Sequence, residues 1–119
     1  MDRESLVCYE KGGRRVNFDN YTDEVNEWRR LVLQSRGIDA AQTLQYSGKI
    51  IAYGEQHNDA FLLGFGYYYS GETYFTLNDG SHFFETINRA LSYLDQAEEW
   101  ELMVRCYNYL GIAAMNRGN

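Results

Sequence analysis

Three short stretches of this sequence align with one another at a nearly constant period. WRRLV (28–32), YYYSG (67–71) and YNYLG (107–111) are offset by 39 and 40, and each carries an aromatic residue at its first position. The segments between them agree under the same shift, with Leu44 aligning with Phe83 and Ile51 with Ala90. A period of this length, kept through two successive segments, indicates stacked structural repeats that bury their apolar faces against their neighbours.

Within this period the pattern predicts five helices and no sheet. Proline is absent, so helices joined by Gly, Asn and Asp turns are favoured. Apolar residues recur at helical spacing, and the inner stripe of the second helix is expected to be Ala41, Leu44, Gly48, Ile51 and Ala52. The expected helix starts are Thr22, Asp39 (with Gln42 as a capping box), Asn58 or Asp59, Asp79 or Ser81, and Glu99 for a last helix that runs to Asn116.

The segment AFLLGFGYYYSGETYFTL could be read as a strand, because GFGYYYSGETYFTL alternates with period two. Its length favours a helix, since about 19 residues between turn signals exceed an ordinary strand. Gly64, Gly66 and Gly71 each weaken a helix by about 1 kcal/mol relative to alanine. We therefore expect another helix to approach this one closely at these glycines.

Composition sets the domain organisation and excludes several partners. We interpret residues 1–21 as a loosely ordered lead-in and residues 22–119 as one helical domain, cut in its third repeat. The net charge is −6, and residues 37–119 hold ten acidic but only four basic residues, which argues against binding to nucleic acid or to an anionic membrane. With two distant cysteines, no signal peptide and no membrane span, a cytoplasmic location is expected.

No pattern for catalysis, a cofactor or a metal stands out. His57 and His82 lie beside turns without metal-ligand spacing, and we expect both to be solvated. Cys106 falls on an apolar helical face, which predicts a buried, unreactive thiol. We therefore predict no catalytic residues, no cofactor and no metal site.

The repeats resemble the tetratricopeptide repeat family, whose first helix carries W-x2-L-G-x2-Y. YNYLG and the step from Gly71 to Tyr74 match this signature and WRRLV matches it partly, whereas the closing proline is missing and the period is longer than is usual for that family. The resemblance implies an all-α superhelix of antiparallel helix pairs, with a concave groove that binds a protein or peptide. The groove residues that it implies are Asn26, Arg29, Arg36, Phe65, Tyr68, Glu72, Phe75, Arg105, Asn108 and Ile112, although Phe65 and Phe75 fit a core role equally well.

Longer repeats of this kind resemble regulatory regions of bacterial signalling proteins, which favours a sensory module of a protein such as a diguanylate cyclase. The alternatives are a homo-oligomerisation or scaffold unit, the regulatory domain of a transcriptional regulator, and an enzyme that uses Glu72 and the tyrosines. The last helix ends in an apolar face without a following helix, so we expect the chain to be a fragment and to form a homodimer. The self-association residues are expected to be Leu110, Ile112, Ala113, Ala114 and Met115.

Overall fold

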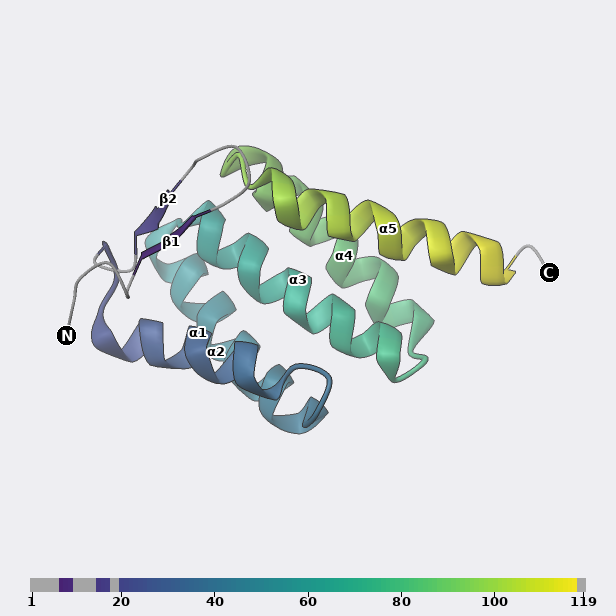
Figure 1. Ribbon diagram of the computed structural model, residues 1–119, viewed down its shortest axis with the longest axis horizontal. Coiled ribbons are helices and arrows are strands. Elements are labelled where there is room, and N and C mark those ends of the chain that lie inside the picture. Colours follow the sequence, from purple (N-terminus) through teal and green to yellow (C-terminus); the bar gives the residue numbers. More distant parts are fainter. Residues whose placement is uncertain (1–6, 10–14, 18–19, 118–119) are drawn as a thin grey trace.

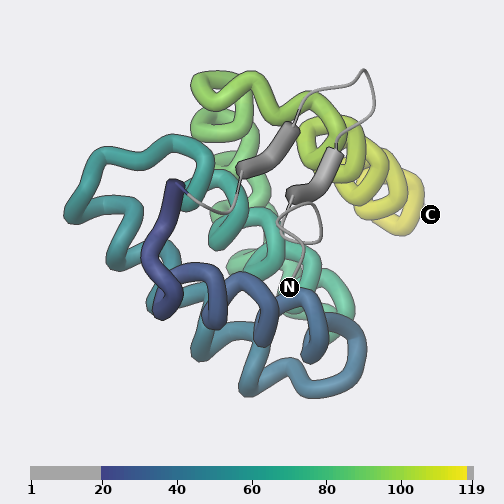
Figure 2. The backbone as a smooth tube through the Cα atoms, turned by 60° about the vertical axis from the view of Figure 1, so that its left-hand side comes forward, coloured from purple at the N-terminus to yellow at the C-terminus, as the bar shows by residue number. Residues whose placement is uncertain are grey.

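The computed structural model describes residues 7–9, 15–17 and 20–117, and from residue 20 to residue 117 the fold is all-α, as predicted (Figure 1). Each helix packs against the next one along the chain, and α3 lies in the middle of the stack with α5 at its edge (Figures 1 and 2). The helices are α1 (Asp23–Ser35), α2 (Ala40–His57), α3 (Ala60–Thr76), α4 (Gly80–Gln96) and α5 (Trp100–Arg117).

A two-stranded antiparallel sheet precedes the helices, so the prediction of no sheet was wrong. Strands β1 (Val7–Tyr9) and β2 (Arg15–Asn17) pair with Cys8 opposite Val16. In the sequence, two short runs that each contain a β-branched residue flank a Gly-Gly pair, which is a hairpin signal. The remainder of the predicted lead-in, apart from Asn20 and Tyr21, lies outside the described residues.

The turns between the later helices recur at a constant interval. Helices α2 to α5 begin at positions 40, 60, 80 and 100, and the last three are each preceded by a residue in the left-handed conformation. These residues are Asn58, Asn78 and Glu98, with φ of 52°, 59° and 56°. The amide of the next residue then donates to a carbonyl five positions back at 2.9 Å in all three turns, which is one of the two bonds of a Schellman ending.

The predicted starts of the first four helices are confirmed by the side chains that cap them. Thr22 accepts a hydrogen bond from the amide of Val25 at 3.1 Å, and Asp39 accepts one from Gln42 at 3.0 Å. Asp59 and Asp79, rather than Asn58 and Ser81, cap α3 and α4. Each cap satisfies an amide that the first helical turn leaves without a partner.

The inner face of α2 was predicted one residue out of register. Of the expected stripe, Ala41, Gly48 and Ala52 are exposed, and Leu44 and Ile51 are only half-buried. The structure instead buries Thr43, Ser47, Ile50 and Gly54, which match the buried stripe of α4 (Phe83, Ile87, Ala90 and Leu94) at a period of 40.

Local hydrogen bonds explain why a polar side chain can occupy the inner face of α2. The hydroxyl of Thr43 donates to the carbonyl of Asp39 at 2.9 Å and lies 2.7 Å from the hydroxyl of Ser35. Burial therefore leaves this hydroxyl paired, and the penalty for an unpaired buried polar group does not arise.

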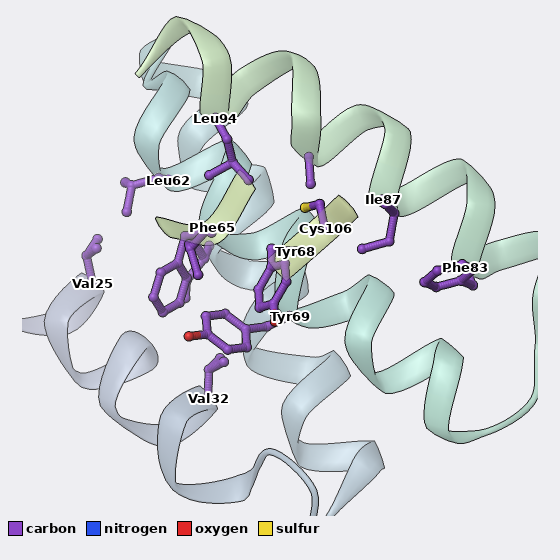
Figure 3. Packing of buried hydrophobic residues seen from close by; sticks show 13 residues of the cluster. Val25, Val32, Leu62, Phe65, Tyr68, Tyr69, Phe83, Ile87, Leu94 and Cys106 are labelled. Carbon is purple, nitrogen blue, oxygen red and sulfur yellow. The ribbon is translucent and has the colours of Figure 1, made fainter. Parts of the chain in front are cut away.

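Helix α3 supplies Leu62, Phe65, Tyr68 and Tyr69 to the buried core (Figure 3). Its glycines allow the close approach that the sequence predicted. A Cβ atom at Gly64 would lie 2.6 Å from Leu94, and one at Gly71 would lie 2.6 Å from Ile87, both of α4. On the opposite side, a Cβ atom at Gly66 would lie 2.5 Å from Ile51 of α2. Packing on two sides explains why this segment is a helix although its sequence suggests strand periodicity.

Candidate functional site

A buried carboxylate, Glu72 of α3, joins three helices that are distant in the sequence. Arg36, at the end of α1, donates to Glu72 Oε1 from Nε at 2.8 Å and to Oε2 from Nη2 at 2.7 Å. The hydroxyl of Tyr68, one turn earlier on α3, donates to Oε2 at 3.0 Å. Tyr109 of α5 donates to the same oxygen at 2.8 Å. This set of four side chains is called the Glu72 cluster below.

Local backbone structure brings these side chains together. Arg36 is the C-cap of α1, with φ of −57° and ψ of 132°, so the backbone leaves the helix at this residue. Tyr68 and Glu72 are separated by one helical turn and therefore share one face of α3. The ring of Tyr109 packs against Phe75, with ring centroids 4.9 Å apart, and this contact holds its hydroxyl near Glu72.

The Glu72 cluster keeps its carboxylate ionised. Burial raises the pKa of Glu72, but hydrogen bonds from Arg36, Tyr109 and Tyr68 outweigh that effect and bring the pKa below its usual value. Burial raises the pKa of Tyr109 to about 12, and burial also raises the pKa of Tyr68. An ionised carboxylate with four donors directed at it is suited to fixing the relative positions of α1, α3 and α5.

Two small cavities adjoin this cluster. One has a volume of about 220 Å³ and is lined by Arg36, Gly37, Glu72, Thr73, Thr76 and Tyr109. The other has a volume of about 180 Å³ and is lined by Phe75, Asn78, Asp79, Gly80, Phe83, Phe84, Ala113, Asn116 and Arg117. Tyr109 lines the first cavity and Phe75 lines the second, so the contact between their rings makes the two cavities neighbours. We call them the polar cavity and the aromatic cavity.

Several residues predicted for the groove do meet at this place. Arg36, Tyr68, Glu72 and Phe75 lie in or beside the Glu72 cluster, although Tyr68 is fully buried. Arg105 of α5 lies close enough to the Tyr68 hydroxyl to interact with it. Asn108 and Ile112 are exposed and line neither cavity.

Arg29 and Phe65 lie instead in another part of the core, around the ring of Phe61. Arg29 is 3% exposed, and its guanidinium lies 5.0 Å from the ring centroid of Phe61 and 5.3 Å from that of Phe65. Tyr21 provides a third ring at 5.5 Å, and Asn26 accepts a hydrogen bond from Arg29 Nη1 at 3.2 Å. Arg29 was predicted as a groove residue, but the structure buries it, and the aromatic faces around it stabilise its guanidinium.

Tyr109 is the site residue that the sequence interpretation missed. The repeat drew attention to Tyr107, which is exposed, whereas Tyr109 is half-buried and contacts Glu72. The sequence signal that could have found it is the alignment of Tyr109 with Tyr69 at a period of 40. Tyr69 is a core residue of α3, and the Arg36 guanidinium lies over its ring.

The histidines and the cysteine lie in ordinary structural surroundings. His57 and His82 are both exposed, as expected; the His57 ring stacks on Tyr53, and His82 contacts the Asp79 carboxylate at 2.7 Å. Cys106 is buried, as predicted, and burial raises the pKa of its thiol to about 12. Among the residues that the structure describes, no three His, Cys, Asp or Glu side chains gather where they could share a metal ion.

The residues predicted for self-association differ in their exposure to solvent. Leu110 and Ala113 are half-buried against the core, whereas Ile112, Ala114 and Met115 are exposed. Three further large apolar residues of α5 are exposed as well: Trp100, Val104 and Tyr107. None of the helices within residues 20–117 combines the length and apolar character needed to span a membrane.

Comparison with known proteins gives no relative: no protein-family model, no curated protein and no solved structure matches this chain.

Proposed function

We propose that the polar and aromatic cavities together form a binding groove for an extended segment of another protein, and that the chain is a non-catalytic, tetratricopeptide-like binding module. The observation that carries this proposal is the Glu72 cluster, which joins α1, α3 and α5 and lines the polar cavity. The ring contact of Tyr109 with Phe75 connects the cluster to the aromatic cavity. A groove whose walls are held in place before binding loses less conformational freedom when a ligand docks.

The size of the cavities favours single side chains of a peptide as occupants. Volumes of about 220 and 180 Å³ are below the range of about 300–1,000 Å³ that is common for small-molecule sites. The aromatic cavity suits an apolar side chain. The polar cavity is lined by the Glu72 carboxylate as well as by Thr73, Thr76 and Arg36. It therefore suits a carboxylate that accepts from the Arg36 N–H groups that Glu72 does not use.

The distribution of positive charge supports an acidic ligand group. From residue 36 onward the chain has five basic residues, and three of them (Arg36, Arg105 and Arg117) lie on this side of the molecule. The chain as a whole carries a net charge of −6. Recognition of an acidic residue therefore depends on these local cations and not on long-range attraction.

The test is binding of fluorescently labelled peptides, about 12 residues long, that pair one Asp or Glu with one Phe or Leu at varied spacing. Thr76 is exposed and lines the polar cavity, so Thr76→Gln fills this space without removing a member of the Glu72 cluster. We expect anisotropy titrations to show at least about tenfold weaker binding for this variant.

Ser92→Gln is the matched control, because Ser92 is an exposed polar residue of α4 that lines neither cavity. It should bind like the wild-type protein. The proposal fails if no peptide in the series binds below about 1 mM, or if Thr76→Gln and Ser92→Gln bind equally well.

The resemblance of the sequence to long-period tetratricopeptide repeats leads us to propose a regulatory role in a larger bacterial signalling protein. In that protein, ligand binding would control an output domain. Finding a nucleotide-cyclase domain encoded after residue 119 of the same gene would support this context. A gene that continues without any output domain would contradict it.

A further inference from the structure

An apolar stripe runs along the exposed side of α5. Trp100, Val104, Tyr107 and Met115 are exposed by 52%, 58%, 59% and 72% of their surface. Gly111 lies on the same stripe, and a Cβ atom built there would have no atom within 4 Å. The three- and four-residue steps place these five residues on one face of the helix, which is called the α5 stripe below.

The internal repeat shows what kind of surface the α5 stripe is. The residues that align with it at a period of 40 are Gly64, Tyr67, Gly71 and Phe75 of α3, in addition to Ala60 at the start of that helix. All four contact α4, whereas within the described part of the chain no helix takes the corresponding place on α5. The α4 contacts are Leu94 at Gly64, Tyr93 stacked on Tyr67, Ile87 at Gly71 and Phe83 against Phe75.

We propose that the α5 stripe binds the same stripe of a second copy of this chain, in an antiparallel helix pair with two-fold symmetry. In one register of such a pair, Val104 lies opposite the partner's Gly111, and Trp100 lies opposite the partner's Met115. Tyr107 then lies next to the symmetry axis. The stripe is therefore complementary to itself, as a two-fold interface requires.

The glycine at position 111 provides the shape complementarity. In α3 the equivalent residue, Gly71, leaves a notch that the side chain of Ile87 fills. Val104 is β-branched like isoleucine and would fill the notch at the partner's Gly111 in the same manner. The pairing repeats, between copies, the packing that α3 and α4 already make within one chain.

Charge also favours an antiparallel pair. Glu98 and Glu101 lie just before and at the start of α5, and Arg117 lies at its end. An antiparallel arrangement places Arg117 of each copy near the acidic end of the partner helix, and it aligns the two helix dipoles favourably. This local attraction offsets part of the repulsion between two chains that each carry a net charge of −6.

The area is sufficient for a weak dimer. About half of the surface of Trp100 and Tyr107 is exposed, so each ring can bury on the order of 100 Å². With Val104, Met115 and neighbouring atoms, the pair would bury roughly 1,000 Å² in total, which is the lower limit for specific interfaces. The dimer should accordingly depend on concentration.

The experiment is sedimentation velocity of the 119-residue chain from about 5 to about 500 µM, with a monomer mass of 13.9 kDa. We expect a shift from monomer to dimer within this range. Gly111→Gln replaces an exposed helical glycine whose Cβ space is open, so the variant should fold normally but remain monomeric.

The chain offers a matched control in Gly48, another exposed helical glycine with open space around its Cβ position. Gly48→Gln should dimerise like the wild type. The proposal is overturned if the wild-type chain stays monomeric over the whole concentration range, or if Gly111→Gln dimerises as readily as Gly48→Gln. A wild-type monomer that binds a synthetic α4 peptide (residues 79–97) would also overturn it, because the occupant would then be a different helix.

Discussion

Replacing Glu72 by glutamine tests whether the Glu72 cluster holds α1, α3 and α5 together. The change preserves shape but removes the charge, and it directs an amide NH2 toward donors that need an acceptor. Glu72 is 6% exposed, and removing one partner of a buried ion pair costs about 3–5 kcal/mol. The Arg36 side chain is 36% exposed, so water replaces part of its interaction with Glu72. We therefore expect Glu72→Gln to lower the free energy of unfolding by about 3 kcal/mol.

The effect of Glu72→Gln should depend on pH. The folded-state pKa of Glu72 lies below the unfolded value because the hydrogen bonds from Arg36, Tyr109 and Tyr68 outweigh burial, which acts in the opposite direction. The unfolded state therefore binds the proton more readily, and the stabilisation is present above the unfolded pKa, about 4.3. This stabilisation is lost as the pH falls through the folded pKa. In acid, the free energy of unfolding of the wild type should therefore approach that of the variant.

Urea unfolding followed by circular dichroism, at several values between pH 7 and pH 3, measures both effects. Glu55→Gln, at an exposed position of α2, is the control and should change the free energy of unfolding by less than about 0.5 kcal/mol. The interpretation is refuted if Glu72→Gln loses less than about 1 kcal/mol at pH 7. It is equally refuted if the difference from the wild type stays constant down to pH 3.

Two further predictions concern the helix packing. Gly66→Ala should destabilise the protein by about 1–2 kcal/mol in the same urea assay, because its Cβ would lie 2.5 Å from Ile51 and 3.0 Å from the backbone oxygen of Ser47. Gly48→Ala should stabilise the protein by up to about 1 kcal/mol, since no heavy atom lies within 4 Å of a Cβ built at this position. If Gly48→Ala were less stable than Gly66→Ala, the packing described above would be contradicted. Cys106 should react with a thiol reagent at pH 8 only as fast as the protein unfolds, because burial raises its pKa to about 12; rapid labelling of native protein would contradict this.

Features governed by local chemistry were predictable from the sequence. The caps at Thr22, Asp39, Asp59 and Asp79 depend on one side chain and an amide three residues later, so they can be recognised in a short window. The glycines of α3 were also informative, since a glycine-rich helix needs a close neighbour to offset its low helix propensity.

Features governed by long-range pairing were not predictable. Glu72 and Tyr109 lie on different helices far apart in the sequence, and no local pattern shows that they share a hydrogen bond. Arg29 was predicted to line the groove, whereas the structure buries it against the rings of Phe61 and Phe65, which lie on a different helix. The α2 register failed for a related reason: Thr43 is polar in the sequence, but its hydroxyl has partners in the fold.

The two periods of this chain arise from different physical causes. The turns recur once per helix because each has the same two residues: one in the left-handed conformation, which ends a helix, and an acidic one directly after it. The next helix then begins at position 60, 80 or 100. The buried faces recur once per pair of helices because Thr43, Ser47, Ile50 and Gly54 take the places of Phe83, Ile87, Ala90 and Leu94. The turn thus determines that neighbouring helices are antiparallel, whereas the side chains determine which helices are equivalent.

This separation explains the difference between α3 and α5. Both helices begin after the same kind of turn, and the equivalent residues Leu62 of α3 and Leu102 of α5 are both buried. Yet α3 packs between α2 and α4, whereas α5 packs mainly on α4 and contacts α3 only weakly. The side of α5 that corresponds to the α4-facing side of α3 therefore keeps Val104, Tyr107 and Met115 exposed. Their exposure follows from the register of the repeat, and the same register predicts that a helix packing on α5 should have a side chain that fills the notch at Gly111.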